Sequence, residues 1–363
     1  MARIRIGVIG CGQIAQIMHL PHLRELHERF ELAAVCDVSP GVLRHVGELH
    51  GVGARFADYR ELLAAPLDAV LVASPDSHGQ VVVDALRAGK HVLSEKPLCY
   101  TLREADEVIA ARRAAGTVCM VAYMKRFDPA VRHALPRIRA MRDLQAIHVT
   151  ILHPPEAAQT AHHDVRRFAD VPEAARRRLR ADQDRLMREA VGDFTAAERF
   201  LFTDSLISTL VHDVNLLRGL SGDPEDVLFT DAWAEAQSLV SVLRFPAGVR
   251  AVLALHFLRD LDRYEERVAY YAPAERISLV FPSPFFRNVP TELVLEGTAD
   301  GYPYRTSVTA SMREAFKEEL LHFADCVETG RTPLTTPEEA REDVSLLHRM
   351  FRALPRPVGG GRS

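Results

Sequence analysis

Short β-branched runs alternate with helical stretches through the first 125 residues, and this alternation restricts the fold more than any other feature of the chain. The runs "RIRIGVIG", "ELAAVCD", "AVLVAS", "HVLSE" and "VCMVAY" are apolar at nearly every position. Such strands are typical of a parallel sheet that helices cover on both faces. The sequence therefore predicts a doubly wound α/β domain over residues 1–125.

The pattern changes after Asp128-Pro129. "LQAIHVTIL" predicts one strand, a helical region extends to about Gly219, and five further strand-like runs follow with turn residues between them. Strands joined by short turns indicate an antiparallel sheet. We expect a second, α+β domain with an open and predominantly antiparallel sheet over residues 126–354, with a helical insertion at about 153–200 and a flexible tail at 355–363.

The turn after the first strand carries a dinucleotide-binding pattern, Gly10-Cys11-Gly12-Gln13-Ile14-Ala15. Gly10 permits a tight turn, Gly12 lets the backbone approach a pyrophosphate, and Ala15 keeps the helix close to the strand. Asp37 ends the second strand, where an acid bonds ribose hydroxyls and repels a 2′-phosphate, so NAD is favoured over NADP. A glycine turn without a ligand, or Asp37 as a plain turn residue in "DVSPG", are the alternatives.

Composition points to a small-molecule partner. The net charge of −4 lacks the basic excess of nucleic-acid-binding proteins. No apolar stretch reaches the roughly 20 residues of a membrane helix, and "MARIRIGVIG" leads directly into a strand pattern rather than a signal peptide, so we expect a cytoplasmic protein. The five cysteines are widely separated, and the histidines of "HPPEAAQTAHHDVRRF" lack a convergent spacing, so we expect neither disulfides nor a metal.

Several motifs together resemble one family. "GKHVLSEKPL" is preceded by "AVLVASPDSHGQ" and followed by "VCMVAYMKRFDPAV", and "MHLPHL" follows the glycine pattern. These motifs, with the closing "REAFKEELLHFADCVETGRTPLTTPEEA", resemble the Gfo/Idh/MocA family (glucose-fructose oxidoreductase, inositol dehydrogenase and rhizopine catabolism). The resemblance covers nearly the whole chain and is strongest over residues 4–130.

The resemblance implies that Lys96 bonds the substrate oxygen that becomes a carbonyl, and that the Lys96–Pro97 bond is cis. The carboxyl end of a parallel strand, where Lys96 stands, is also where doubly wound folds bind ligands. A surface Lys96 paired with Glu95 is the plainer alternative, although neighbours in a strand point to opposite faces.

"FTDSLISTLVHDVNLLRGL" resembles the family's catalytic helix, in which His212 would be the general base. Ser208 stands where the family has an aspartate, and Asn215 stands where it has a second acid. Three outcomes stay open: a dehydrogenase with a weaker base, a reductase that relies on Lys96 or another residue, and different NAD chemistry. A buried core histidine is the plainer interpretation of His212.

The expected function is that of an NAD(P)-dependent oxidoreductase that moves hydride between nicotinamide and a secondary alcohol or ketone of a sugar, polyol or sugar-like metabolite. The alternatives are an NAD-dependent redox-neutral enzyme, for glycosidic cleavage or epimerisation, and a non-catalytic NAD-binding regulator. We expect Lys96 and His212 to be catalytic, and the substrate to contact Lys96, Tyr123, Ser208, His212 and Asp213. The expected cofactor-binding residues are Gly10, Gly12, Gln13, Ile14, Asp37, Ser74, Pro75, His78, Glu95, Lys96, Pro97 and Arg126.

Two further expectations concern surfaces. "VRAVLALHFL" is apolar on both faces, which predicts that a second subunit, or helices of the same chain, cover its outer face and hence favours a homo-oligomer, dimer or tetramer. "VPEAARRRLRADQDRLMREA" interleaves arginines with acids at i,i+4, which predicts a solvated helix; an arginine clamp for substrate phosphates is the alternative. We interpret the whole 153–200 segment as a mobile lid that shapes the substrate pocket.

Overall fold

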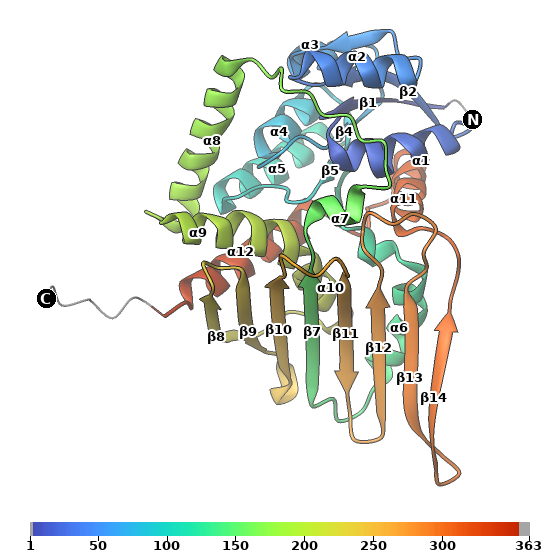
Figure 1. Cartoon of the computed structure of the whole chain (residues 1–363). Helices are drawn as coiled ribbons and strands as arrows, with labels where there is room; N and C mark the ends of the chain where they lie inside the picture. The colour runs from blue at the N-terminus through green and yellow to red at the C-terminus, as the bar shows by residue number, and fades with distance from the viewer. Residues whose placement is uncertain (1–2, 356–363) are drawn as a thin grey trace, which may run out of the picture. The chain divides into compact units, whose positions relative to one another are not determined.

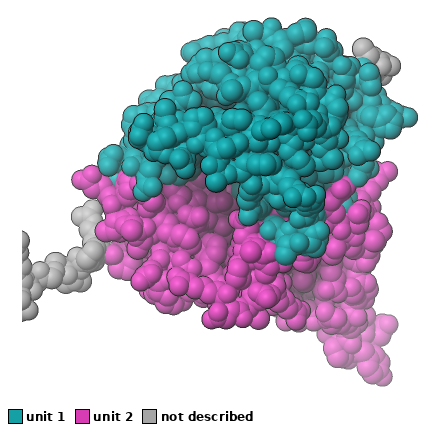
Figure 2. Space-filling view, turned by 45° about the horizontal axis from the view of Figure 1, so that its top comes forward, with its two compact units in different colours: residues 1–127, 160–192, 314–344 teal, residues 128–159, 193–313, 345–363 magenta. Residues whose placement is uncertain are grey.

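The computed structural model describes residues 3–355, so most of the expected tail at 355–363 lies outside the described residues. The chain divides into two compact units, coloured separately in Figure 2. Unit 1 contains the chain up to Phe127 together with Thr160–Gly192 and Glu314–Val344. Unit 2 contains Asp128–Gln159, Asp193–Arg313 and the chain from Ser345. The first boundary lies two residues after the expected one, and two distant segments join the amino-terminal unit.

Unit 1 contains the predicted parallel sheet, in the order β3-β2-β1-β4-β5-β6 (Figure 1). Its strands are β1 Ile4–Ile9, β2 Phe30–Cys36, β3 Ala54–Phe56, β4 Ala69–Val72, β5 His91–Glu95 and β6 Cys119–Ala122. All residues of β4 and β6 are buried, as expected for strands covered on both faces. The strand order changes direction between β1 and β4, and ligands bind doubly wound sheets at the carboxyl ends of strands at such a point.

The helices of unit 1 start and stop at recognisable signals. Ser39 caps α2 by accepting a hydrogen bond from the Val42 backbone, and Thr101 and Glu104 form a capping box that starts α5. The helical segments are η1 Ala15–His19, α1 Leu20–Glu25, α2 Pro40–Leu49, α3 Tyr59–Leu63, α4 Gly79–Arg87, α5 Leu102–Ala115, η2 Met124–Phe127, α8 Glu173–Val191 and α11 Ala315–Thr329. Helix α11 adds Leu320 and Phe323 to the core that β1 forms, so residues more than 300 positions apart close one hydrophobic core.

Unit 2 contains one eight-stranded sheet in the order β14-β13-β12-β11-β7-β10-β9-β8 (Figure 1). Only β7 and β10 pair in parallel, so the predicted open, mainly antiparallel sheet is confirmed. Its strands are β7 Ala146–His153, β8 Asp226–Trp233, β9 Ser238–Arg244, β10 Arg250–Phe257, β11 Glu265–Tyr271, β12 Glu275–Phe281, β13 Glu292–Ala299 and β14 Tyr302–Thr309. The sequence reasoning missed β8 and β14, which are the two edge strands. β14 is mostly polar and exposed, as is typical of edges, whereas β8 exposes the large hydrophobic residues Leu228, Phe229 and Trp233.

The helices of unit 2 are α6 Pro129–Ala140, α7 Glu156–Thr160, α9 Ala196–Phe200, η3 Leu201–Leu210, α10 Val211–Ser221 and the short η4 Pro246–Gly248; α12 Pro337–Arg352 runs from unit 1 into unit 2. Strand β10 alternates between buried Ala251, Leu253 and Leu255 and half-buried Val252 and Ala254. The described chain therefore buries one face of this strand fully and leaves the other partly open, so the alternative in which helices of the same chain bury the outer face is wrong.

The inserted segment differs from its expected form. Most charged side chains of α8 are exposed and Arg185 pairs with Glu189 at i,i+4, as the charge pattern predicted, but Leu186, Met187 and Ala190 are buried. The i,i+4 pattern accounted for the charged side chains but could not reveal that one apolar stripe of the helix is buried. Of all helices in residues 3–355, none is both long and apolar enough to cross a membrane.

Candidate active site

The glycine turn has the geometry of a dinucleotide cradle. Gly10 has φ +88°, and a side-chain carbon there would lie 2.4 Å from the Ser74 nitrogen, so the close approach of β1 and β4 requires glycine. Gly12 is exposed, and a carbon added there would meet no atom within 4 Å. The backbone at Gly12 is thus open to a ligand, and the first helical turn begins beside it, at Ala15.

Asp37 fastens the same turn from the end of β2. One carboxylate oxygen accepts a hydrogen bond from the Cys11 nitrogen and the other from the Ser39 nitrogen, each at 2.8 Å. Burial raises the pKa of Asp37 above its ordinary value, although these two hydrogen bonds oppose the rise. The carboxylate is held at the end of β2, the position of the acid that bonds ribose hydroxyls in dinucleotide-binding folds, so the residues present fit this cofactor class.

His78 joins the loops that follow β4 and β5. Its ring is buried, with Nδ1 2.7 Å from the Glu95 carbonyl oxygen and Nε2 2.6 Å from the Ser74 carbonyl oxygen. Burial lowers the pKa of His78. Both ring nitrogens are engaged by the protein, so His78 braces the loop that contains Ser74 and the exposed Pro75.

Lys96 directly follows β5, and the Lys96–Pro97 bond is cis, as predicted. Burial lowers the pKa of Lys96, the neighbouring charge of Lys125 lowers it further, and Glu95 opposes both. A lysine with a lowered pKa gives up its proton more readily than an ordinary one. This ammonium therefore suits hydrogen bonding to, and proton exchange with, a reacting oxygen.

Both oxygens of the Glu95 carboxylate are engaged by neighbouring groups. One oxygen of its buried carboxylate lies 2.7 Å from His19 Nε2, and the other accepts a hydrogen bond of 3.0 Å from the Lys96 backbone nitrogen. Burial acts to raise the pKa of Glu95, but the hydrogen bond and charge of His19 outweigh it, and the pKa is lowered. Sequence reasoning missed His19, although "MHLPHL" contained it.

Glu319 of α11 is a second residue that the sequence reasoning missed. Its side chain is inaccessible to solvent, and neither carboxyl oxygen has a hydrogen-bond partner within residues 3–355. Burial and the nearby charge of Glu95 raise the pKa of Glu319 well above its ordinary value. Burial therefore favours the protonated form of the Glu319 carboxyl, and no motif in the sequence indicated this residue.

Tyr123 and Arg126 follow β6, as expected. Tyr123 is 1% exposed. The Arg126 guanidinium lies 3.7 Å from a Glu339 carboxylate oxygen, with 10% of its side chain exposed. Their roles toward cofactor or substrate stay predictions.

The candidate residues of unit 2 lie on a helix that is not a regular α-helix. Leu201–Leu210 is a π-helix, in which Thr209 Oγ1 bonds the carbonyl oxygen of Asp204 five residues earlier, and His212 is the second residue of α10. A π-turn contains more residues per turn than an α-turn, so side chains four residues apart in this segment, such as Ser208 and His212, do not share one face as they would in an α-helix. π-Turns inside helices are frequent at functional sites.

Within this helix Ser208 is exposed and His212 is half-buried. Asp213 is fully buried, and its charge, after burial and Glu266, raises the pKa of Tyr264. Asp213 thus faces the interior of unit 2. Its carboxylate could contact a substrate only if a passage led inward from Ser208 and His212. The structure brings the predicted cofactor residues together in unit 1, and places Ser208, His212 and Asp213 in unit 2.

The fold and the glycine cradle define a dinucleotide-binding oxidoreductase of the Rossmann class. Residues 4–123 match the family described as "Oxidoreductase family, NAD-binding Rossmann fold". This match and the curated relatives below support the Gfo/Idh/MocA family for this chain.

Full-length relatives agree. Myo-inositol 2-dehydrogenase of Thermotoga maritima is 26% identical over 354 residues, which span 93% of this chain and 92% of that protein. The scyllo-inositol 2-dehydrogenase (NAD(+)) of Bacillus subtilis is 24% identical, with 93% and 90% covered. Two solved structures share the fold, each with a TM-score of 0.73. KijD10, a 3-ketoreductase from Actinomadura kijaniata in complex with NADP, is 19% identical, with 97% of this chain and 98% of that chain covered. The aldose-aldose oxidoreductase from Caulobacter crescentus complexed with glycerol is 20% identical, with 97% of each chain covered.

Proposed function

We propose that this protein is an NAD(P)-dependent oxidoreductase that transfers hydride between nicotinamide and a CH–OH carbon of a polyol or sugar. The observation that carries the proposal is Lys96, a lysine of lowered pKa at the end of β5 in the unit whose glycine turn is open to a dinucleotide. Relatives named for inositol oxidation and sugar ketone reduction support the substrate class. They do not favour a redox-neutral enzyme or a non-catalytic regulator.

In this mechanism a bound nicotinamide dinucleotide supplies the hydride acceptor in oxidation and the hydride donor in reduction. The Lys96 ammonium donates a hydrogen bond to the substrate oxygen and stabilises its negative charge as the carbon–hydrogen bond breaks. Glu95, held by His19, fixes the backbone of Lys96. We assign the hydroxyl proton to His212, because an imidazole exchanges protons near neutral pH.

The test is a screen of inositols and sugars with NAD and NADP, followed by absorbance of the reduced cofactor. We expect oxidation of at least one polyol, and Lys96→Met should lower kcat by about 10²–10³-fold, the loss typical for one donor at a developing oxyanion. Lys317→Met removes a lysine whose ammonium pairs with Glu25 and serves as control. Undiminished turnover in Lys96→Met, or no turnover on any polyol or sugar, contradicts the proposal.

His212→Asn is the second variant of this test. It should lower kcat and remove the limb of the pH–rate profile that reports the ionisation of the base. A His212→Asn enzyme with an unchanged profile would show that another group takes the proton.

Three finer points belong to the same proposal. NAD is the expected cofactor because Asp37 stands at the end of β2, where an acid bonds the ribose hydroxyls and repels a 2′-phosphate. A homo-oligomer is expected because β10 leaves Val252 and Ala254 half-buried. A cytoplasmic location fits five buried cysteines, all of them unpaired thiols.

A further inference from the structure

The segment 160–192, which we call the strap, packs on the dinucleotide-binding unit. In Figure 1 this green part of the chain passes beside α2 before it forms α8. The sequence predicted a lid that shapes the substrate pocket. The contacts of the strap instead lie at the glycine turn, at the start of α2, at the loop after β4 and at the start of α5.

The strap is bonded to the glycine turn through two glutamines. Gln16 Oε1 accepts a hydrogen bond of 2.9 Å from the Arg166 nitrogen, and Gln16 Nε2 donates to the Arg166 carbonyl oxygen at 3.1 Å and to the Cys11 carbonyl oxygen at 2.9 Å. Arg167 donates to the side chain of Gln13. The strap therefore lies next to the residues that the fingerprint assigns to the cofactor.

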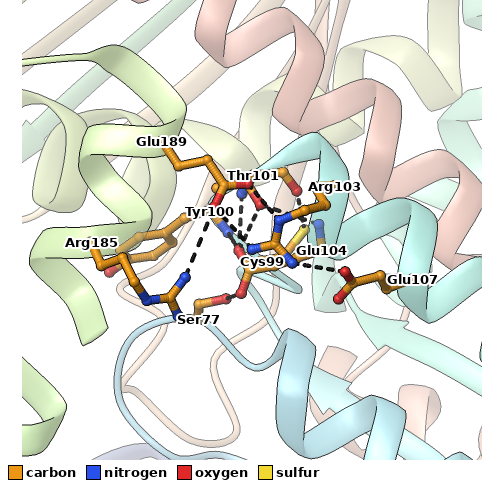
Figure 3. A network of polar contacts seen from close by, with 9 residues as sticks. All are labelled: Ser77, Cys99, Tyr100, Thr101, Arg103, Glu104, Glu107, Arg185 and Glu189. Atoms are coloured by element: carbon orange, nitrogen blue, oxygen red, sulfur yellow. Dashed lines mark hydrogen bonds and ion pairs between the residues drawn. The ribbon is translucent and has the colours of Figure 1, made fainter.

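Helix α8 holds the other end of the strap in place. Figure 3 shows Glu189 of α8 beside Arg103 at the start of α5. The two side chains form a paired hydrogen bond, with distances of 2.8 and 2.9 Å. Gln183 donates to Asp76, in the loop after β4, at 2.5 Å. A bidentate arginine–carboxylate pair restricts geometry more than a single contact, so these contacts fix where the strap runs.

Between these two ends, the Asp170 carboxylate occupies the hydrogen-bond donors at the start of α2. One oxygen accepts from the Gly41 nitrogen at 2.7 Å, and the other accepts from the Ser39 hydroxyl. Glycine is required at position 41, because an added side-chain carbon would lie 2.5 Å from the Phe168 ring and 2.8 Å from Asp170. The charge of Arg44 acts on Asp170 from the same helix and helps to lower its pKa, after the Ser39 hydrogen bond.

These donors adjoin Asp37, the expected ribose-binding acid. Ser39 donates its backbone nitrogen to Asp37 and its hydroxyl to Asp170, and the charge of Asp170 contributes to the raised pKa of Asp37. A phosphate on the 2′-oxygen of a ribose held by Asp37 would need the Ser39 hydroxyl, the Gly41 nitrogen and Arg44. Phosphates bind such a set of amide, hydroxyl and guanidinium donors.

We propose that Asp170 is a cofactor-selecting residue, which occupies the donors that a 2′-phosphate would use and so disfavours NADP relative to NAD. The proposal rests on the proposed function only in that a nicotinamide dinucleotide binds at the glycine turn. It adds a second carboxylate to the selection by Asp37, and this carboxylate comes from a segment more than a hundred residues further along the chain. A 2′-phosphate carries about −1.5 to −2 charges, so it both competes with Asp170 and is repelled by it.

The test is titration of the full chain with NADH and with NADPH, followed by nicotinamide fluorescence. Asp170→Ala removes the charge and frees the donors, and Asp170→Asn removes the charge while leaving one acceptor. We expect Asp170→Ala to lower the Kd for NADPH about tenfold or more and to change the Kd for NADH less than about threefold, with Asp170→Asn between wild type and Asp170→Ala. In the Asp170→Ala background, Arg44→Ala should cancel most of the gain for NADPH.

Glu173→Ala is the matched control, because it removes a carboxylate three residues further on from a side chain that pairs within α8 with Arg176. It should change neither Kd. An unchanged NADPH-to-NADH ratio in Asp170→Ala, or equal changes for both cofactors, overturns the selection by Asp170. Preference of the wild type for NADPH overturns it as well. Failure of the wild type to bind either cofactor overturns the dinucleotide assignment itself, and the two failures are thus distinguishable.

Discussion

The buried carboxyl of Glu319 makes the stability of this protein depend on pH in a defined direction. Glu319 is inaccessible to solvent, its two oxygens lack hydrogen-bond partners within residues 3–355, and Glu95 lies near with a like charge. The folded chain therefore keeps this carboxyl protonated above the pH at which the unfolded chain releases the proton. The raised pKa contributes stability that is fully present at low pH and is lost as pH rises toward the folded-state pKa.

The magnitude follows from proton linkage. While the folded state holds one proton more than the unfolded state, the free energy of unfolding falls by about 1.4 kcal/mol per pH unit. Glu319→Gln keeps the shape of the side chain and cannot ionise, so it removes this slope. Above the ordinary pKa of glutamate, the difference in unfolding free energy between Glu319→Gln and the wild type should therefore grow in favour of the variant, by about 1.4 kcal/mol per pH unit until the pH reaches the folded-state pKa.

The assay is urea denaturation followed by far-ultraviolet circular dichroism at pH 5, 6 and 7. Other ionising groups are common to both proteins, so they cancel in the difference. Glu28→Gln, at an exposed position, controls for the loss of one carboxylate. A difference between Glu319→Gln and wild type that stays constant from pH 5 to pH 7 would refute the reasoning, because it would mean that Glu319 is ionised in the folded protein.

Two further predictions concern the glycine turn and the open sheet face. Gly10→Ala should lower the free energy of unfolding by about 1–3 kcal/mol and abolish NADH binding, because the φ of +88° and the 2.4 Å approach to the Ser74 nitrogen exclude a methyl group. Gly53→Ala is the control, because a methyl group there meets no atom within 4 Å. Thermal unfolding and NADH titration measure the two effects, and unimpaired NADH binding by Gly10→Ala would contradict the role of the glycine turn. Val252→Glu should shift the mass in light scattering from oligomer to smaller species, because a charge on the half-buried face of β10 opposes its burial against a partner. A monomeric wild type, or an oligomer that Val252→Glu leaves intact, would contradict an interface there.

Much of the fold could be predicted because strands and turns are local patterns. Apolar runs bounded by turn residues predicted all strands of both sheets except β3, β8 and β14. Strand β3 is three residues long and mostly exposed, and β14 is a polar edge, so neither has the buried face that produces a hydrophobic pattern. Strand β8 is an edge whose apolar residues Leu228, Phe229 and Trp233 are exposed, so they do not alternate with polar ones as on a half-buried strand. The π-helix before His212 was missed because an apolar helical stripe predicts a helix but does not reveal an extra residue in a turn.

The sequence by itself determined the dinucleotide cradle, the parallel sheet that carries it and the Lys96–Pro97 element, because each depends on neighbouring residues and on one strand-to-helix turn. Only the tertiary structure decided which side chains surround them. His19 and Glu319 meet Glu95 from segments 76 residues before and 224 residues after it, and Asp170 meets Ser39 and Gly41 from 131 and 129 residues away. The packing of helices and of the strap on one sheet creates these contacts, and no local pattern in the chain records them.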